Sequence, residues 1–186
     1  QRLNPISPYG RSKLCVEWML EDSFRAYGMS YAVLRYFNVA GADPLGRTGQ
    51  SSKVATHLIK VAVQAAVGLR SHVKLFGNDY STPDGTCIRD YVHVTDLAKA
   101  HLLALQHLRA GGKKIICNCG YGEGYSVNEV LNAVRDVSGI SFPIEIAARR
   151  AGDPATLVAS NKHISSTLDW RAQFNDLHMI IEHALA

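Results

Sequence analysis

The sequence lacks long apolar segments and blocks of like charge. No apolar run approaches the roughly 20 residues that a helix needs to cross a bilayer. Its 20 Lys and Arg residues and 16 Asp and Glu residues are scattered, and the formal charge of +4 is modest. These absences argue against a membrane or a nucleic acid as a partner, while a small excess of base also suits a compact anionic ligand.

Thiol and imidazole groups are sparse and do not form ligand patterns. The four cysteines contain no C-x-x-C pair, and the eight histidines are dispersed. His178 and His183 are five residues apart, whereas two imidazoles share a helical face at a spacing of i, i+4. We therefore expect no metal site. We expect reduced, packed thiols of a cytoplasmic protein at four positions: Cys15, Cys87, Cys117 and Cys119.

The start of the sequence lacks the features of a complete chain. It begins Gln-Arg-Leu-Asn-Pro, with neither an initiator Met nor the basic and apolar regions of a signal peptide. A G-x-G-x-x-G turn between a first strand and a helix is missing as well. The nearest counterpart, residues 120–125, ends in Tyr125, so we interpret it as a glycine-rich turn rather than a phosphate-binding loop. We expect a soluble fragment cut from a longer protein.

The sequence does contain an alternation of helix and strand patterns. We expect helices at residues 7–26, 54–67, 96–108, 126–137, 161–168 and 176–184. We expect strands at residues 30–37, 73–76, 88–92, 115–119 and 143–146. Ser7 followed by Pro8 is typical of a helix start, and Ser126 with Glu129 forms a capping-box pattern. The alternation predicts an α/β protein with parallel strand pairing.

The first predicted helix carries a Y-x-x-x-K pair, Tyr9 and Lys13. On a helix the two side chains lie one turn apart on the same face. A phenol with the ordinary pKa of about 10 is a poor base at neutral pH, and a nearby ammonium group favours the phenolate. Such a pair can take a proton from a sugar hydroxyl while hydride leaves the same carbon. The spacing alone is common on amphipathic helices and does not assign a function.

Further segments make the pattern specific. Residues 7–13 (S-P-Y-G-R-S-K) and 34–41 (L-R-Y-F-N-V-A-G) resemble the extended short-chain dehydrogenase/reductase superfamily. Residues 76–94 (F-G-N-D-Y-S-T-P-D-G-T-C-I-R-D-Y-V-H-V) look specifically like the UDP-glucose (UDP-galactose) 4-epimerases. The similarity continues through 149–153 (R-R-A-G-D) to 168–170 (L-D-W), so it covers essentially the whole chain in family order.

The resemblance implies a fold and its division. The chain is expected to be the C-terminal portion of an extended Rossmann-type, NAD-binding epimerase together with its small substrate-binding α/β domain. Residues 1–40 would be a remnant of the Rossmann domain. Residues 41–186 would mainly form the UDP-sugar-binding domain, with about 86–110 returning to the Rossmann sheet. In the family, most NAD contacts precede the tyrosine helix, so this fragment is expected to be inactive, to bind NAD poorly and to expose apolar surface on its first helix.

The resemblance also implies a reaction. NAD takes hydride from C4 of the hexose while Tyr9 takes the 4-OH proton; the 4-keto sugar then turns, and hydride returns to the opposite face. UDP-glucose and UDP-galactose are interconverted, by a homodimer in the full-length enzyme. The implied cofactor contacts are Tyr9, Lys13 and Tyr36. The implied substrate contacts are Phe37, Asn38, His57, Leu58, Val73, Lys74, Phe76, Arg89, Tyr91, Arg150 and Asp153.

Several alternatives remain open from the sequence. Arg89 could form a surface ion pair with Asp90, and Arg149 rather than Arg150 could reach the ligand. Tyr36, Phe37 and His57 could be packing residues. The chain could also be a UDP-sugar-binding module without redox chemistry, or belong to a sister nucleotide-sugar dehydratase or decarboxylase.

Overall fold

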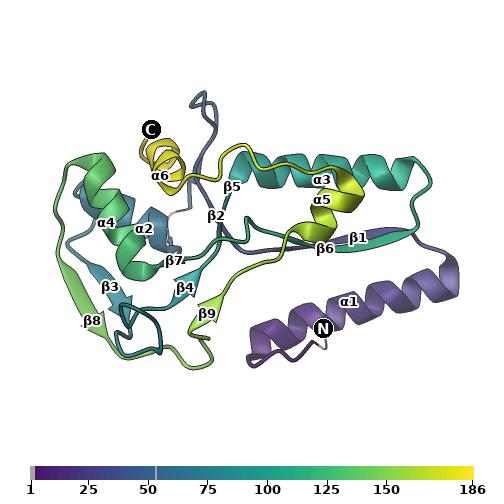
Figure 1. Cartoon of the computed structure of the whole chain (residues 1–186), viewed down its shortest axis with the longest axis horizontal. Helices are drawn as coiled ribbons and strands as arrows, with labels where there is room; N and C mark the ends of the chain where they lie inside the picture. Colours follow the sequence, from purple (N-terminus) through teal and green to yellow (C-terminus); the bar gives the residue numbers. More distant parts are fainter. Residues whose placement is uncertain (1–2, 53) are drawn as a thin grey trace.

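Helices and strands alternate along the part of the chain that the computed structural model describes, residues 3–52 and 54–186 (Figure 1). The helices are α1 (Pro8–Tyr27), α2 (Leu58–Ala66), α3 (Val94–Arg109), α4 (Val127–Ser138), α5 (Lys162–Leu168) and α6 (Leu177–Leu185). The strands are β1 (Tyr31–Tyr36), β2 (Asn38–Ala40), β3 (Val73–Phe76), β4 (Ile88–Arg89), β5 (Tyr91–His93), β6 (Lys114–Cys119), β7 (Tyr125–Ser126), β8 (Ile144–Ala147) and β9 (Thr156–Leu157).

Most strands pair in parallel, as predicted. β1 pairs with β6, β2 with β5, β3 with β8 and β4 with β9. The exception is the antiparallel pairing of β4 with β7, which follows the glycine-rich turn. The strand predicted at 88–92 is interrupted at Asp90, because Asp90 donates its N–H to Leu157 on one side and accepts the Asn38 N–H on the other. The chain changes partner at this residue, from β9 to β2.

The predicted helix starts and ends are largely confirmed. Ser7 accepts the Gly10 N–H at 3.1 Å, and α1 ends at Gly28, whose φ of 69° suits glycine. Ser126 and Glu129 form the predicted capping box of α4. The start predicted for the second helix is wrong: α2 begins at Leu58 rather than at residue 54. The preceding segment is held differently, because the carbonyl of the buried Ala55 accepts a hydrogen bond from Arg70.

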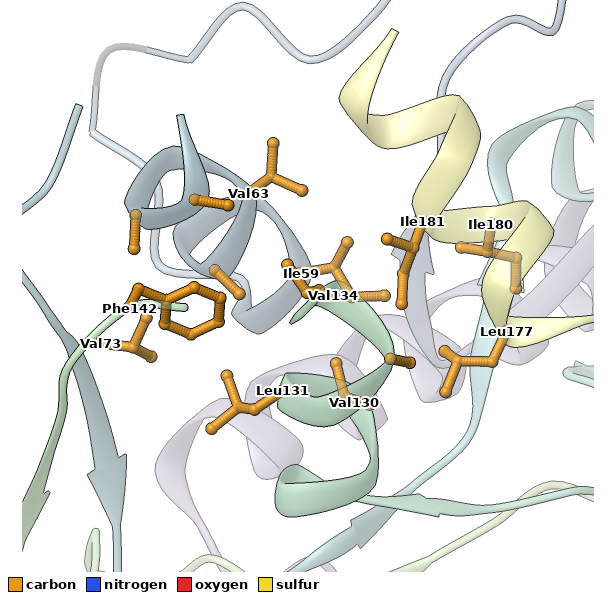
Figure 2. Close-up of a cluster of buried hydrophobic side chains, with 14 of the residues drawn as sticks. Ile59, Val63, Val73, Val130, Leu131, Val134, Phe142, Leu177, Ile180 and Ile181 are labelled. Carbon is orange, nitrogen blue, oxygen red and sulfur yellow. The ribbon is translucent and has the colours of Figure 1, made fainter. Parts of the chain in front are cut away.

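Buried apolar side chains form two clusters. In the first, side chains of α2, α4 and α6 converge with Val73 and Phe142 (Figure 2). In the second, residues of α3, α5 and β6 surround Trp170, which is 1% exposed. Cys117 and Cys119 share a buried face there, as the alternation predicts, whereas Cys15 is exposed and the prediction of a packed thiol is wrong for it. Cys15 lies on a helix that contributes no buried residue.

Helix α1 stands apart from both clusters. The structure describes all of it, and none of its residues is buried. Its contacts include hydrogen bonds between side chains: Glu17 pairs with Arg35, and Glu21 accepts hydrogen bonds from Lys114 and Tyr31. These partners, Lys114 foremost, lower the pKa of Glu21 to about 2. Figure 1 shows α1 and α3 on opposite sides of the β1–β6 pair. Several apolar side chains of α1 are exposed: Val16, Trp18 and Met19.

A buried carboxylate joins the strands to the glycine-rich turn. Asp90 is fully buried and accepts N–H groups from Tyr121 at 3.0 Å, Gly122 at 3.0 Å and Ala159 at 3.2 Å. A Cβ at Gly120 would lie 2.7 Å from Oδ2 of Asp90, so only glycine permits this approach. Burial raises the pKa of Asp90, against the effect of the three N–H groups. The turn therefore binds a carboxylate of its own chain, as expected for a structural turn.

No described helix is both long and apolar enough to cross a membrane. The part of the chain that the structure describes also contains no group of three or more His, Cys, Asp and Glu residues arranged to hold a metal ion.

We predict that Leu131→Ala lowers the free energy of unfolding by about 2–5 kcal/mol, because Leu131 is fully buried between three helices. Leu102→Ala is the matched control, since Leu102 is 46% exposed on α3 and should change stability by no more than about 0.5 kcal/mol. Urea unfolding measures both. Equal effects of the two changes would contradict the packing described.

We predict that Asp90→Asn costs about 1–3 kcal/mol of stability, because an amide offers one acceptor oxygen where the carboxylate offers two, and its NH2 group then faces backbone N–H groups. Asp136→Asn, an exposed change on α4, is the control. Chemical denaturation followed by circular dichroism gives both values. A stability of Asp90→Asn equal to that of the control would contradict the role assigned to the carboxylate.

Candidate functional site

A cavity of about 710 Å³ is lined by the first residues of β2 and β5, by β3, by the end of β4 and by the start of α2. Ten of the eleven residues predicted to bind substrate line it: Asn38, His57, Leu58, Val73, Lys74, Phe76, Arg89, Tyr91, Arg150 and Asp153. Phe37 does not line this cavity and is half-buried on the segment between β1 and β2. The sequence separates these ten residues by more than 100 positions, and the strand pairings bring them together.

Two arginines predicted to bind the substrate, Arg89 and Arg150, line the cavity. Arg89 is largely buried, and donates to the carbonyl of Ile88 at 2.8 Å and to Asp153 at 3.4 Å. The guanidinium carbon of Arg150 lies 3.8 Å from the centre of the Phe76 ring. Arg89 therefore does not pair with Asp90 at the surface, and that alternative is wrong. Arg149 does not line the cavity; its side chain contacts Asp79 and Tyr80 instead.

Asn38 and His57 also line the cavity. The Asn38 side-chain amide donates to the carbonyl of Asp90 at 3.0 Å, which fixes its orientation. His57 is exposed just before α2, with its Nδ1 atom 3.4 Å from Nε2 of Gln50, so the alternative of a packing histidine is wrong. Asn38, His57, Leu58 and Tyr91 also line a second cavity of about 310 Å³, which adjoins the first.

Sequence reasoning missed several cavity residues: Ala55, Thr56, Val61, Leu69, Arg70, Ser71, His72, Cys87 and Val127. His72 directly precedes β3 and had a detectable signal, because residues two apart in an extended chain share a face and Lys74 was predicted. The two side chains meet at Glu145, with His72 Nε2 at 3.1 Å and Lys74 Nζ at 3.7 Å from its oxygens. Arg70 had no such signal, since it lies in a loop after α2.

Tyr9 and Lys13 lie in the first turns of α1. The Lys13 ammonium nitrogen is 5.1 Å from the centre of the Tyr9 ring, so the two side chains share a face as the spacing predicts. Tyr9 is 73% exposed, and neither residue lines the cavity of about 710 Å³. The loop containing Gly152 connects the two regions: a Cβ on Gly152 would lie 3.6 Å from Cβ of Ser7. The tyrosine helix thus begins beside the loop that carries Arg150 and Asp153.

Tyr36 ends β1 with its side chain 54% exposed, so the alternative that it packs in a core is wrong. Its ring centre lies 6.2 Å from that of His101 on α3. The exposed hydroxyl groups of Tyr9 and Tyr36 and the Lys13 ammonium group are hydrogen-bonding groups of the kind that a ribose and a nicotinamide amide require.

Comparison with known proteins places this geometry in a family. Residues 1–120 match the model described as "NAD dependent epimerase/dehydratase family". A UDP-glucose 4-epimerase of Azospirillum brasilense is 56% identical over 182 residues, which are 98% of this chain and 52% of that protein. A UDP-glucose 4-epimerase of Streptococcus mutans is 50% identical over 182 residues, which are 98% of this chain and 55% of that protein.

Solved structures agree. The Brucella ovis UDP-glucose 4-epimerase in complex with NAD has a TM-score of 0.93 and 46% identity, covering 100% of this chain and 57% of that one. The Bifidobacterium longum enzyme in complex with NAD+ and UDP has a TM-score of 0.92 and 36% identity, covering 100% of this chain and 55% of that one.

The chain spans about half the length of the relatives that it matches. The predicted α/β fold of a Rossmann-type epimerase and the resemblance to UDP-glucose 4-epimerases are confirmed. By its sequence and by its fold, the chain belongs to the NAD dependent epimerase/dehydratase family.

Proposed function

We propose that the chain supplies the substrate-binding half and the tyrosine–lysine pair of a UDP-glucose 4-epimerase, which interconverts UDP-glucose and UDP-galactose with NAD. The observation that carries the proposal is the convergence of ten predicted substrate residues on one cavity of about 710 Å³. That volume lies within the range of about 300–1,000 Å³ typical of small-molecule sites.

Arg89 and Arg150 would hold the diphosphate. A guanidinium group presents a planar fork of N–H donors that matches two phosphate oxygens, and both groups face the cavity. Asp153 pairs with Arg89 at the cavity, where its carboxylate can accept a hydrogen bond from a ribose hydroxyl. Phe76 and its neighbours on β3 would flank the uracil. A strong grip on the diphosphate leaves the hexose free to turn about its tether.

Tyr9 would act on the hexose from the start of α1. Lys13 lies one helical turn away, with its ammonium nitrogen 5.1 Å from the centre of the Tyr9 ring. Tyr9 would take the proton of the 4-OH group and later return it, while Lys13 and Tyr36 hold the ribose and nicotinamide side. NAD bound there would supply the hydride acceptor and donor. The exposed side chains of all three residues fit such contacts.

The 186 residues alone are proposed to bind UDP but not to epimerise it. They contain no glycine fingerprint of a dinucleotide-binding turn, so most contacts to NAD would have to come from other residues. The exposed apolar side chains of α1, among them Val16 and Met19, would form part of a homodimer contact.

We predict that isothermal titration with UDP shows binding without NAD, and that Arg89→Met weakens it by about 10- to 100-fold, since a charged hydrogen bond to phosphate is lost. Arg171→Met is the control, because Arg171 is exposed and pairs with Asp169 rather than lining the cavity. No heat with UDP, or equal weakening by the control, would contradict the proposed site.

We further predict that a hybrid with the first half of the Azospirillum brasilense relative ahead of this chain converts UDP-galactose to UDP-glucose. Tyr9→Phe should lower its kcat by about 10²- to 10⁴-fold, the usual contribution of a general base. Tyr27→Phe, at the far end of α1 and 85% exposed, should leave kcat unchanged. NMR analysis of the products separates epimerisation from dehydration and decarboxylation. Near-normal turnover of the Tyr9→Phe hybrid would exclude Tyr9 as the base.

A further inference from the structure

Two adjacent arginines stack on two different aromatic rings. The guanidinium carbon of Arg150 lies 3.8 Å from the centre of the Phe76 ring, inside the cavity. That of Arg149 lies 4.3 Å from the centre of the Tyr80 ring, outside it. The chain between β8 and β9 is thus held on two sides at successive residues, and the function proposed above uses only the inner one.

The Arg149 side chain forms hydrogen bonds with the loop that follows β3 and stacks on a ring of that loop. Its Nε atom donates to Oδ1 of Asp79 at 2.6 Å, and its Nη2 atom donates to the backbone carbonyl of Asp79. The ring of Tyr80 beneath it is buried, with 6% of its surface exposed. The guanidinium group also holds the pKa of Asp79 below its ordinary value. A side chain that contacts a carboxylate, a carbonyl and a ring of one loop has a single defined position.

The absence of a side chain at Gly77 leaves room for Arg149 to stack on Tyr80. Its φ of 81° lies in the left-handed region, which side chains disfavour. A Cβ built there would lie 2.6 Å from Cγ of Arg149 and 2.8 Å from Cε2 of Tyr80, so any larger residue would displace the arginine. The Gly77 N–H also donates to the carbonyl of Ala147 at 2.9 Å, which extends the β3–β8 pairing by one residue. Beyond it, the contacts of Arg149 with Asp79 hold the two segments together.

Among the described residues, few other contacts restrain residues 150–153. Arg150 begins a turn in which the Asp153 N–H donates to the Arg150 carbonyl at 3.3 Å, and Asp153 reaches Arg89 at 3.4 Å. The Arg149–Asp79 pair is exposed, with 45% and 70% of the side chains accessible, so it contributes little to global stability. Its geometric consequence is larger, because it fixes the backbone from which Arg150 enters the cavity.

We propose that Arg149 is a positioning residue, which anchors this segment to the loop after β3 and so holds Arg150 against the ring of Phe76, ready for the diphosphate. This role rests on the function proposed above. Arg149 does not touch the ligand; it acts through Arg150, and its effect is confined to ligands that carry phosphate groups.

The test is a double-mutant cycle on UDP affinity in the protein. Arg149→Met keeps the aliphatic stem but loses the charge and both hydrogen bonds, and should weaken UDP binding about three- to tenfold. In an Arg150→Ala background the same change should have almost no further effect. Uridine, which lacks phosphates, should bind the Arg149→Met variant as it binds the parent protein. Gly77→Ala should reproduce the loss for UDP, and Arg171→Met should leave it unchanged.

A loss that persists in the Arg150→Ala background, or that is equal for UDP and uridine, would overturn the proposal in favour of a general structural role. Amide hydrogen exchange of residues 150–153 gives a readout without ligand: it should become about three- to tenfold faster in Arg149→Met and stay unchanged in Arg171→Met. If the parent protein binds no UDP, the proposed function fails, whereas the exchange rates still decide whether Arg149 anchors the segment. Unchanged exchange in Arg149→Met would refute the anchor itself.

Discussion

The arrangement of the cavity depends on one buried carboxylate. The Asp90 carboxylate accepts backbone N–H groups from the glycine-rich turn and from Ala159, and its carbonyl accepts hydrogen bonds from the backbone N–H and the side-chain amide of Asn38. It stands between Arg89, which faces the cavity, and β5, which continues into α3. A buried carboxylate without hydrogen-bond donors would cost free energy. The glycine-rich turn and the segment around Ala159 therefore pack against Asp90 and supply those donors. The positions of Arg89 and Asn38 follow from that packing.

The two guanidinium groups at the cavity are held by different means. Arg89 is largely buried and binds the Ile88 carbonyl and Asp153, whereas Arg150 stacks on the Phe76 ring and is positioned, as proposed above, by Arg149. Rigid donors lose little conformational entropy when they engage an anion. For a substrate whose hexose must turn while its diphosphate stays fixed, rigidity at one end and freedom at the other are the physical requirement. Tyr9 is exposed, and Ser7, two residues before it, lies beside Gly152.

Local patterns predicted most elements, because capping residues, glycines and alternation act within a few positions. The capping box at Ser126 and the parallel pairing of most strands are examples. The motif resemblance supplied ten of the residues that line the cavity. What the sequence could not supply were partners distant along the chain. The break at Asp90 arises from strands that lie far away in the sequence, and the choice between Arg149 and Arg150 depends on where Asp79 and Phe76 are placed.

These distant segments, as proposed above, assemble a binding site for a diphosphate in one cavity. A crystal structure of the chain with bound UDP tests it most directly. We expect phosphate oxygens within hydrogen-bonding distance of the Arg89 and Arg150 guanidinium groups, with the Asp90 contacts to the glycine-rich turn intact. UDP bound elsewhere, or a diphosphate in the cavity that neither arginine contacts, would contradict it.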